Sequence, residues 1–305
     1  MELGWPVRDG GIRYYGSSDA TSWFLVVLDA TGDAALQRDL APARAAAARW
    51  LDGTLRAGGG FVRCGPRRFP GGLAQQGWRD SLDPARDANG GGIVRPDGSM
   101  PTAPLADADS QAVAIAALDA LTRLDGPGAR GWSQRAAQLR ARVQRVFTPE
   151  VLALDGVDRP VSGAGSQLGW LLWAGALDAP STDRAVARLT RDDVLTPFGV
   201  RTLAATHPAF RVDGYHRGAI WPFDSWLAWG GLRRVGALDA ADRVRGGVLR
   251  ALDQLGRYPE LYAVDRDRAR PRVGPRVRPI EVANRVQAWT VGARLALETG
   301  WDGRV

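Results

Sequence analysis

Apolar residues recur every three or four positions along most of the chain, which is the spacing of one buried face of an α-helix. Residues that open or end helices bound several of these segments, such as Pro42 at a first turn and the glycines at 58–60. The segments predicted as helices are 18–32, 42–57, 107–125, 130–147, 166–177, 181–191, 221–236, 238–256 and 281–299. Since no convincing hairpin pattern interrupts them, the sequence predicts an all-α fold of about nine helices.

Two of these segments differ from the amphipathic majority. The apolar run Trp23–Leu28 contains adjacent valines and fits a buried strand or a buried helix, and its helical neighbours favour a helix. Segment 166–177 is apolar almost all round, so it must be buried on both sides. In the last predicted helix, the apolar positions expected to face inward are Val282, Val286, Trp289, Ala293 and Leu297.

Long loops alternate with short turns along the predicted helices. Segments 58–106, 192–218 and 257–280 are long and show little periodicity, and 58–106 is also rich in Gly and Pro. A long loop in a compact domain is more often functional than a filler. If the helices form hairpins arranged in a ring, alternate loops lie on one rim, where we expect the chemistry.

The charge and the small numbers of Cys and His argue against several functions, namely nucleic-acid binding and metal binding. All 40 basic residues are Arg, and they are scattered among 33 acidic ones, which we interpret as a compositional bias that leaves a net charge of +7. The cluster at 266–278 is interpreted as a solvated loop, so no nucleic-acid partner is expected. One Cys and two His exclude an internal disulfide and a His-rich metal site, and no cofactor is expected.

No stretch of 18 apolar residues occurs, and the N-terminus lacks the apolar core of a signal peptide. The sequence therefore predicts a cytoplasmic protein with no membrane partner.

Residues 213–235 combine aromatic and ionisable side chains at high density. The group comprises Tyr215, His216, Arg217, Trp221 and Asp224. Aromatic faces stack on the apolar faces of a pyranose, while the polar groups can bind its hydroxyls, so the segment suits a sugar. We expect Trp221 to be a stacking platform and Trp289 a packed core residue. The alternative is that this is a Trp-rich helix start buried between its neighbours.

Any general acid and base catalysis must fall to carboxylates, because the chain has one thiol and no residue order typical of a Ser-His-Asp catalytic triad. Asp80 follows Trp78 in the first long loop, and Glu260 lies between Tyr258 and Tyr262 in the last. Two carboxylates from distant loops beside tryptophans fit glycosidic bond cleavage. Taken singly, each could equally be a helix cap or a surface group.

Six segments, in order, resemble motifs of one family, the glycogen-debranching amylo-alpha-1,6-glucosidase group and its mannosylglycerate-hydrolase-like relatives. Residues 13–21, Arg-Tyr-Tyr-Gly-Ser-Ser-Asp-Ala-Thr, resemble Tyr-Tyr-Gly-Ser-Val-Asp-Ala-Thr, and Gln76-Gly-Trp-Arg-Asp-Ser81 is similar to Gln-Gly-Trp-Lys-Asp-Ser. Residues 215–224 are similar to Tyr-His-Asn-Gly-Ser-Val-Trp-Pro-His-Asp. The other three are 197–203, 259–262 and 286–289.

The resemblance implies an (α/α)6 six-hairpin barrel with an inverting glycosidase site, Asp80 as general acid and Glu260 as general base. An inverting pair stands roughly 6.5–9.5 Å apart. Asp80 must then hold a proton, which burial beside Trp78 favours and Arg79 opposes. The residues implied to contact the sugar are Tyr15, Asp19, Gln76, Trp78, Gln111, Tyr215, His216, Arg217, Trp221 and Asp224.

The chain also departs from the motifs it resembles. Phe223 stands where the family has His, and Asp109-Ser-Gln111 stands for Glu-Val-Gln. About nine of the barrel's twelve helices are predicted. Residues 1–305 are therefore expected to be the C-terminal portion of an (α/α)6 catalytic domain, completed by a missing N-terminal segment or a separate chain.

The function implied is inverting hydrolysis of α-glucosidic linkages in glycogen or α-glucan branch stubs, small α-glucosides or mannosylglycerate-like compounds. The partner is an oligosaccharide or small glycoside. Two alternatives stay open: a truncated, non-catalytic carbohydrate-binding remnant of the barrel, and lyase or phosphorylase chemistry on the same scaffold.

Overall fold

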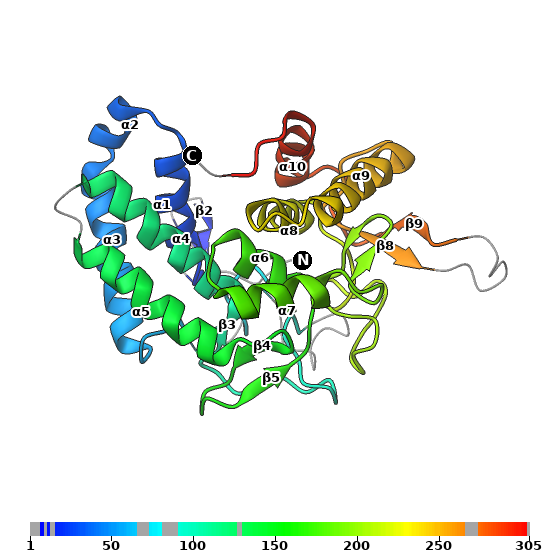
Figure 1. Ribbon diagram of the computed structural model, residues 1–305, viewed down its shortest axis with the longest axis horizontal. Helices are drawn as coiled ribbons and strands as arrows, with labels where there is room; N and C mark the ends of the chain where they lie inside the picture. Colours follow the sequence, from blue (N-terminus) through cyan, green and yellow to red (C-terminus); the bar gives the residue numbers. More distant parts are fainter. Residues whose placement is uncertain are drawn as a thin grey trace.

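The computed structural model describes residues 7–8, 11–12, 16–65, 73–80, 91–126, 130–265 and 274–303. These residues hold ten helices and nine short strands (Figure 1). The helices are α1 (Ala20–Ala30), α2 (Ala34–Asp39), α3 (Ala41–Ala57), α4 (Ala108–Asp125), α5 (Arg130–Val146), α6 (Gln167–Trp173), α7 (Ala179–Leu189), α8 (Pro222–Arg234), α9 (Leu238–Leu255) and α10 (Ala288–Thr299). The fold is thus all-α, as predicted.

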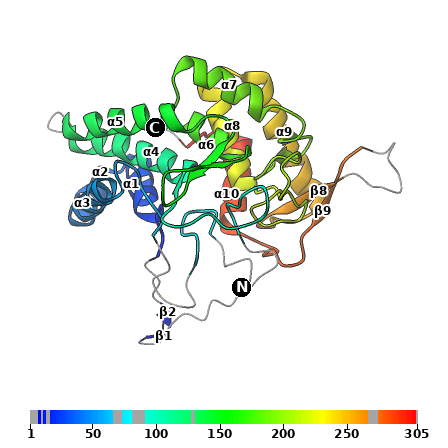
Figure 2. The same cartoon turned by 90° about the horizontal axis from the view of Figure 1, so that it is seen from below.

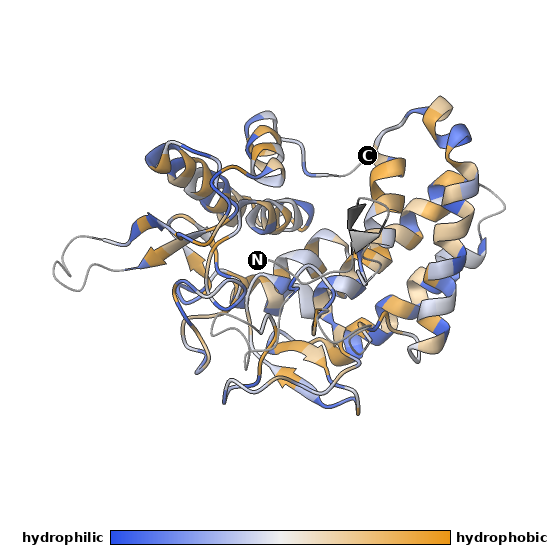
Figure 3. Cartoon of the chain, turned by 180° about the vertical axis from the view of Figure 1, so that it is seen from behind, coloured by the Kyte–Doolittle hydropathy of each residue, from blue (hydrophilic) through white to orange (hydrophobic). Residues whose placement is uncertain are grey.

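The helices form two rows. Helices α1, α4, α6, α8 and α10 pack each against the next, while α3, α5, α7 and α9 each cover one of the first four from outside (Figures 1 and 2). The outer helix α9 carries a hydrophobic stripe and a hydrophilic one (Figure 3). Its buried residues include Val244, Val248 and Leu252. Inner and outer helices joined in hairpins therefore make up the body of the structure.

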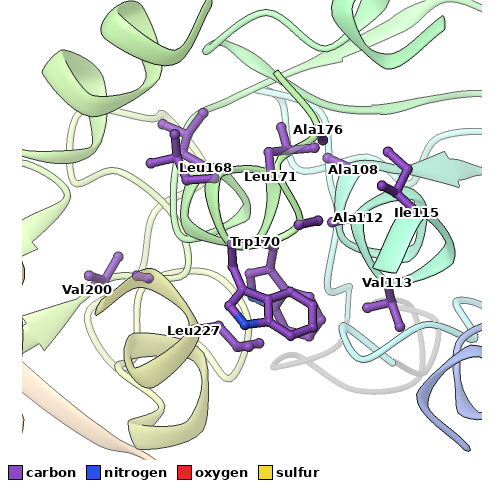
Figure 4. Packing of buried hydrophobic residues seen from close by; sticks show 14 of the residues in the cluster. Ala108, Ala112, Val113, Ile115, Leu168, Trp170, Leu171, Ala176, Val200 and Leu227 are labelled. Carbon is purple, nitrogen blue, oxygen red and sulfur yellow. The ribbon is translucent and has the colours of Figure 1, made fainter. Parts of the chain in front are cut away.

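Helix α6 lies at the centre of the core, between α4 and α8 (Figure 4). All seven of its residues are buried, which confirms the prediction of a segment covered on both sides. A Cβ on Gly169 would lie 2.5 Å from Cα of Ala228, so glycine at this position lets α6 approach α8 closely. Trp170, with no exposed surface, fills the inner end of this contact.

The expectation that the chain has no hairpin is wrong. Strands β4 (Val151–Leu154) and β5 (Pro160–Ser162) pair antiparallel, with β3 (Ala106–Asp107) added at the β4 edge. Three two-stranded hairpins join β1 (Val7–Arg8) to β2 (Gly11–Ile12), β6 (Leu195–Thr196) to β7 (Gly199–Val200), and β8 (Tyr262–Asp265) to β9 (Arg276–Pro279). Strands of two to four residues are too short for an alternating pattern to show.

The C-terminal helix also differs from its prediction. It starts at Ala288, seven residues after 281, and the preceding residues form a turn. Val282, Val286 and Trp289 are 71%, 68% and 41% exposed, so only Ala293 and Leu297 of the expected inner face are buried. The helical spacing of apolar residues in the sequence extends over 281–287, although these residues form a turn and not a helix. The short helix α2 was not predicted either.

The run at 266–278 was interpreted as a solvated loop. Its described end forms part of β9, where Arg278 Nε donates to Asp265 Oδ2 at 2.8 Å, and residues 266–273 lie outside the described part. None of the helices in the described part of the chain combines the length and the apolar character needed to cross a membrane.

Candidate active site

The loop before α8 meets the first residue of β8 through a backbone bridge. Ile220 and Tyr262 exchange antiparallel hydrogen bonds of 2.9 and 3.0 Å between backbone N and O. The bridge joins segments that are more than forty residues apart, and it sets Glu260 beside Tyr215. Both belong to the set of residues expected at the site from the sequence.

Three donors face the two carboxylate oxygens of Glu260, whose residue is 5% exposed. Tyr215 Oη donates to Oε1 at 2.6 Å, and the backbone N and Nδ2 of Asn284 each donate to Oε2 at 3.2 Å. Burial and the contact with Glu260 raise the pKa of the Tyr215 phenol, so Tyr215 remains a donor at neutral pH. Glu260 is thus oriented as a hydrogen-bond acceptor at both oxygens.

Asp80, the second proposed carboxylate, lies beside His216, the residue that follows Tyr215 in the chain. Its side chain is 46% exposed, and Oδ1 is 3.5 Å from Nε2 of the buried His216. Burial lowers the pKa of the His216 imidazole, an effect that Asp80 opposes. Because the His216 ring also contacts the Tyr215 ring edge to face at 4.9 Å, one chain of contacts links Asp80 to Glu260.

The rings of Trp78, Tyr215, His216 and Trp221 form an aromatic cluster, which Asp80 touches at His216 and Glu260 touches at Tyr215. His216 stacks on Trp221 with centroids 5.0 Å apart and planes 6° apart, and Trp78 presents an edge to both. Trp78 in turn stacks on Trp170 at 5.3 Å. Trp78 and Tyr215 are half-buried, so these two rings of the cluster reach the surface beside Asp80 and Glu260.

Trp221 is a packed residue, which corrects its expected role as a stacking platform. It is 2% exposed, its Nε1 donates to the Tyr215 carbonyl at 2.8 Å, and His216 covers one face of its ring. Trp289, expected to be packed, is 41% exposed instead. The order of burial is thus the reverse of the one expected, and Trp289 is the second residue of α10, which begins later than predicted.

Gln111 and Asp224 are buried in the scaffold instead of facing a ligand. Gln111 is fully buried, and its amide exchanges hydrogen bonds with N and O of Val62 and donates to the Asp107 carbonyl. Asp224 has no exposed surface and accepts a 2.6 Å hydrogen bond from Trp170 Nε1. Both therefore tie segments of the fold together, and the expected sugar contact is not available to them in this structure.

The remaining expected residues are placed as follows. Asp19, which precedes α1, is 8% exposed and accepts from Ser17 Oγ, and burial raises its pKa to about 6. Gln76 and Arg217 are both buried, and the Gln76 carbonyl accepts from Ser18 N at 2.9 Å. Tyr15 lies outside the described residues.

Sequence reasoning missed the contacts that two residues make at the site. Asn284 was assigned to a helix, although its turn binds Glu260. Arg79 was considered only as a charge beside Asp80, yet its guanidinium donates to Asp109 at 2.6 Å. Each partner lies more than twenty residues away along the chain, so no local spacing indicates the contact.

A separate cavity of about 790 Å³ lies between β6, β8 and α9. Its walls carry Arg and Asp side chains, among them Arg201, Asp242 and Asp265, and contain no aromatic ring. Because none of the described residues expected to bind sugar lines it, we place the site at the aromatic cluster. Among the described residues, no three His, Cys, Asp or Glu side chains gather as metal ligands would.

Replacing Asp224 with Asn should make stability less dependent on pH. Burial raises the pKa of Asp224 to about 7 from 3.8, so between these values the folded state binds a proton that the unfolded state has lost. The free energy of unfolding therefore falls as pH rises through this window, and Asn removes that fall. Relative to wild type, Asp224→Asn should gain at least ~1 kcal/mol between pH 4.5 and 7.5 in urea unfolding. An unchanged difference at the two pH values would contradict the raised pKa.

Comparisons with known proteins identify the family and the fold. Residues 13–263 match the family model described as mannosylglycerate hydrolase MGH1-like glycoside hydrolase domain. No curated protein matches the chain.

Three solved structures are similar. The GH63 mannosylglycerate hydrolase from Thermus thermophilus in complex with Tris has a TM-score of 0.50 and 17% identity, over 64% of this chain and 46% of that chain. Neutral trehalase Nth1 from Saccharomyces cerevisiae has a TM-score of 0.50 and 16% identity, over 64% and 38%. A protein described as a sialidase has a TM-score of 0.59 and 15% identity, over 84% and 24%.

These likenesses show a shared fold. The mannosylglycerate hydrolase and the trehalase are (α/α)6 glycosidases, and the paired inner and outer helices of this chain correspond to part of such a barrel, as the sequence predicted. The chain spans less than half the length of the mannosylglycerate hydrolase and of the trehalase that it matches.

Proposed function

Because the chain belongs to the family of mannosylglycerate hydrolase MGH1-like glycoside hydrolase domains, we propose that it hydrolyses α-linked glycosides with inversion at the anomeric carbon. Asp80 is the general acid and Glu260 the general base. The single observation that carries this proposal is the cluster around Tyr215 and His216, which holds the two carboxylates on one set of aromatic rings.

The surroundings of each carboxylate suit its proposed role. Asp80 is partly exposed and can reach the oxygen of a leaving group, whereas Glu260 is held by Tyr215 and Asn284 in a fixed orientation. In the proposed reaction, Asp80 gives its proton to the glycosidic oxygen while Glu260 takes one from a water that attacks the anomeric carbon from the opposite face. Water adds across the broken bond, and the sugar inverts.

Small α-linked glycosides are the proposed substrates. Two of the similar structures, the mannosylglycerate hydrolase and the trehalase, are named for small glycosides. Half-buried Trp78 and Tyr215 offer aromatic surface for one sugar ring. Branch stubs of glycogen or another α-glucan, as in the debranching enzymes whose motifs the chain resembles, form the second substrate class.

The test is turnover of a panel that contains isomaltose, trehalose, mannosylglycerate and a branched α-glucan. We expect free sugar to be released, and proton NMR in the first minutes reports the sugar whose anomeric carbon was attacked, before mutarotation. From mannosylglycerate this sugar should appear first as the β-anomer, and trehalose should give α- and β-glucose in equal amounts. Mannose that appears first as the α-anomer, or trehalose that gives α-glucose alone, would overturn inversion.

The alternatives give different products. Binding of these glycosides without turnover would favour a non-catalytic remnant of the barrel. An unsaturated sugar would indicate a lyase, and release that requires inorganic phosphate would indicate a phosphorylase.

A further inference from the structure

Arg79, between Trp78 and Asp80, is buried beneath the proposed site at 4% exposure. Its guanidinium donates three hydrogen bonds, to Asp109 Oδ2 at 2.6 Å, to the Thr202 carbonyl at 2.8 Å and to Ser166 Oγ at 2.9 Å. The three acceptors belong to α4, to the loop after β7 and to the residue before α6. One side chain thus fastens the loop of Asp80 to three separate parts of the scaffold.

The ion pair between Arg79 and Asp109 is closed to water at both ends. The side chains are 4% and 2% exposed, and Asp109 lies in the first turn of α4, where the helix dipole favours a negative charge. Removing one partner of such a pair leaves a buried charge without its counter-ion. Arg79 and Asp109 therefore need each other as counter-ions in the buried site. The geometry of their contact depends on the length of both side chains.

The backbone at Arg79 is held as well. A Cβ on Gly92 would lie 2.2 Å from the Arg79 carbonyl oxygen, so glycine at 92 lets the two segments touch. In the same loop, the side chain of Gln75 exchanges hydrogen bonds of 2.6 and 2.7 Å with O and N of Ile93. The loop carrying Asp80 is thus held at Gln75 and at Arg79, the residue just before Asp80.

We infer that the Arg79–Asp109 pair is the positioning device of the general acid. Resting on the proposed function, this inference deepens it: Arg79 touches no substrate, but fixing its guanidinium fixes the backbone from which Trp78 and Asp80 project. A proton donor displaced by about 1 Å loses much of its effect on the rate. The charge of Arg79 is matched by Asp109, so the guanidinium serves as an anchor in the scaffold.

Side-chain length makes the inference testable. The motifs that the chain resembles have Lys at the position of Arg79 and Glu at that of Asp109. In this chain the basic side chain is therefore longer than in the motifs, and the acidic side chain is shorter. Arg79→Lys keeps the charge and loses the planar fork. Asp109→Glu adds one methylene. The double variant restores the summed reach of the pair, and its activity should recover relative to Arg79→Lys.

The experiment compares two substrates that differ in their need for an acid. Isomaltose has a poor leaving group that must be protonated, whereas α-glucosyl fluoride has a leaving group that departs with little help. We expect Arg79→Lys to lower kcat on isomaltose about tenfold more than on the fluoride, with KM changed little on either. The double variant Arg79→Lys/Asp109→Glu should regain about fivefold of the loss on isomaltose.

Arg95→Lys is the matched control, because Arg95 forms a 2.6 Å ion pair with the buried Asp155 and has no contact with the cluster. It should leave both rates unchanged. Equal losses on the two substrates in a folded Arg79→Lys protein, or no recovery in the double variant, would overturn the inference. If Arg79→Lys does not fold, Asp109→Glu alone carries the same comparison, with the same expected and contrary results.

Failure of the proposed function can be distinguished from failure of the anchoring role of Arg79. If wild type turns over neither substrate, the proposed function fails for α-glucosides, and the anchor is judged by amide hydrogen exchange instead. Amides of residues 77–80 should then exchange at least about tenfold faster in Arg79→Lys than in Arg95→Lys. Equal exchange in the two variants would overturn the anchoring role.

Discussion

Glu260→Gln and Asp80→Asn should each lower kcat by at least about 10², the usual contribution of a general acid or base. Gln cannot take the proton from the attacking water, and Asn cannot supply one to the leaving oxygen. The measurement is steady-state hydrolysis of the glycoside that wild type cleaves best. Glu281→Gln, an exposed carboxylate close to Asn284 in the sequence, should keep full activity.

The two variants should differ in stability. Glu260 is 5% exposed and faces three donors, so an amide NH₂ at that position meets at least one of them and should cost ~1–3 kcal/mol of unfolding free energy. Asp80 is 46% exposed at its side chain and should tolerate Asn with little change. Retention of more than about a tenth of the rate in either variant would remove that residue from the proposed pair.

Trp221→Ala should lower the unfolding free energy by ~3–5 kcal/mol, the usual cost of emptying a buried aromatic site. The side chain is 2% exposed, stacks on His216 and packs in a small cluster with Leu261, Ala263 and Ile280. Its removal also leaves the Tyr215 carbonyl without the indole donor. Urea unfolding at pH 7 measures the effect.

Trp289→Ala is the matched control of the same residue type. Trp289 is 41% exposed and stacks on Phe223 at 5.6 Å, so its loss should cost less than ~2 kcal/mol. An equal or larger loss for Trp289 than for Trp221 would contradict the packing described here. The comparison thus tests in solution the buried position of Trp221, which fits the second of the two sequence hypotheses for residues 213–235, a helix start buried between its neighbours.

Much of the fold could be predicted because burial along a helix is a local, periodic property. The apolar positions of 107–125 and 238–256 repeat with the helical period, and α4 and α9 follow within one residue at each end. Segment 166–177 was apolar all round, and α6 is buried all round. Short strands such as β6 and β7 could not be predicted, since two residues carry no period.

The candidate site could be predicted only in part. Motif order picked out Asp80 and Glu260. The structure sets Glu260 beside the Tyr215 ring, where the Ile220–Tyr262 bridge joins their segments, and Asp80 beside the His216 ring. The sequence pattern could not show that the Gln111 amide forms hydrogen bonds with the backbone of Val62, a contact between residues 49 positions apart. A polar residue reads the same in a sequence whether it faces a ligand or the scaffold.

By itself, then, the sequence determined the helical class, the buried central helix and the group of side chains from which a site could be built. Only the tertiary structure decided which rings are packed and which are exposed, as Trp221 and Trp289 show. It also decided which acidic and basic side chains form ion pairs. Arg79 reaches the Thr202 carbonyl 123 residues away, because α4, α6 and the loop after β7 converge there. Periodicity records how much of each residue is buried, whereas hydrogen-bond partners depend on where distant segments meet.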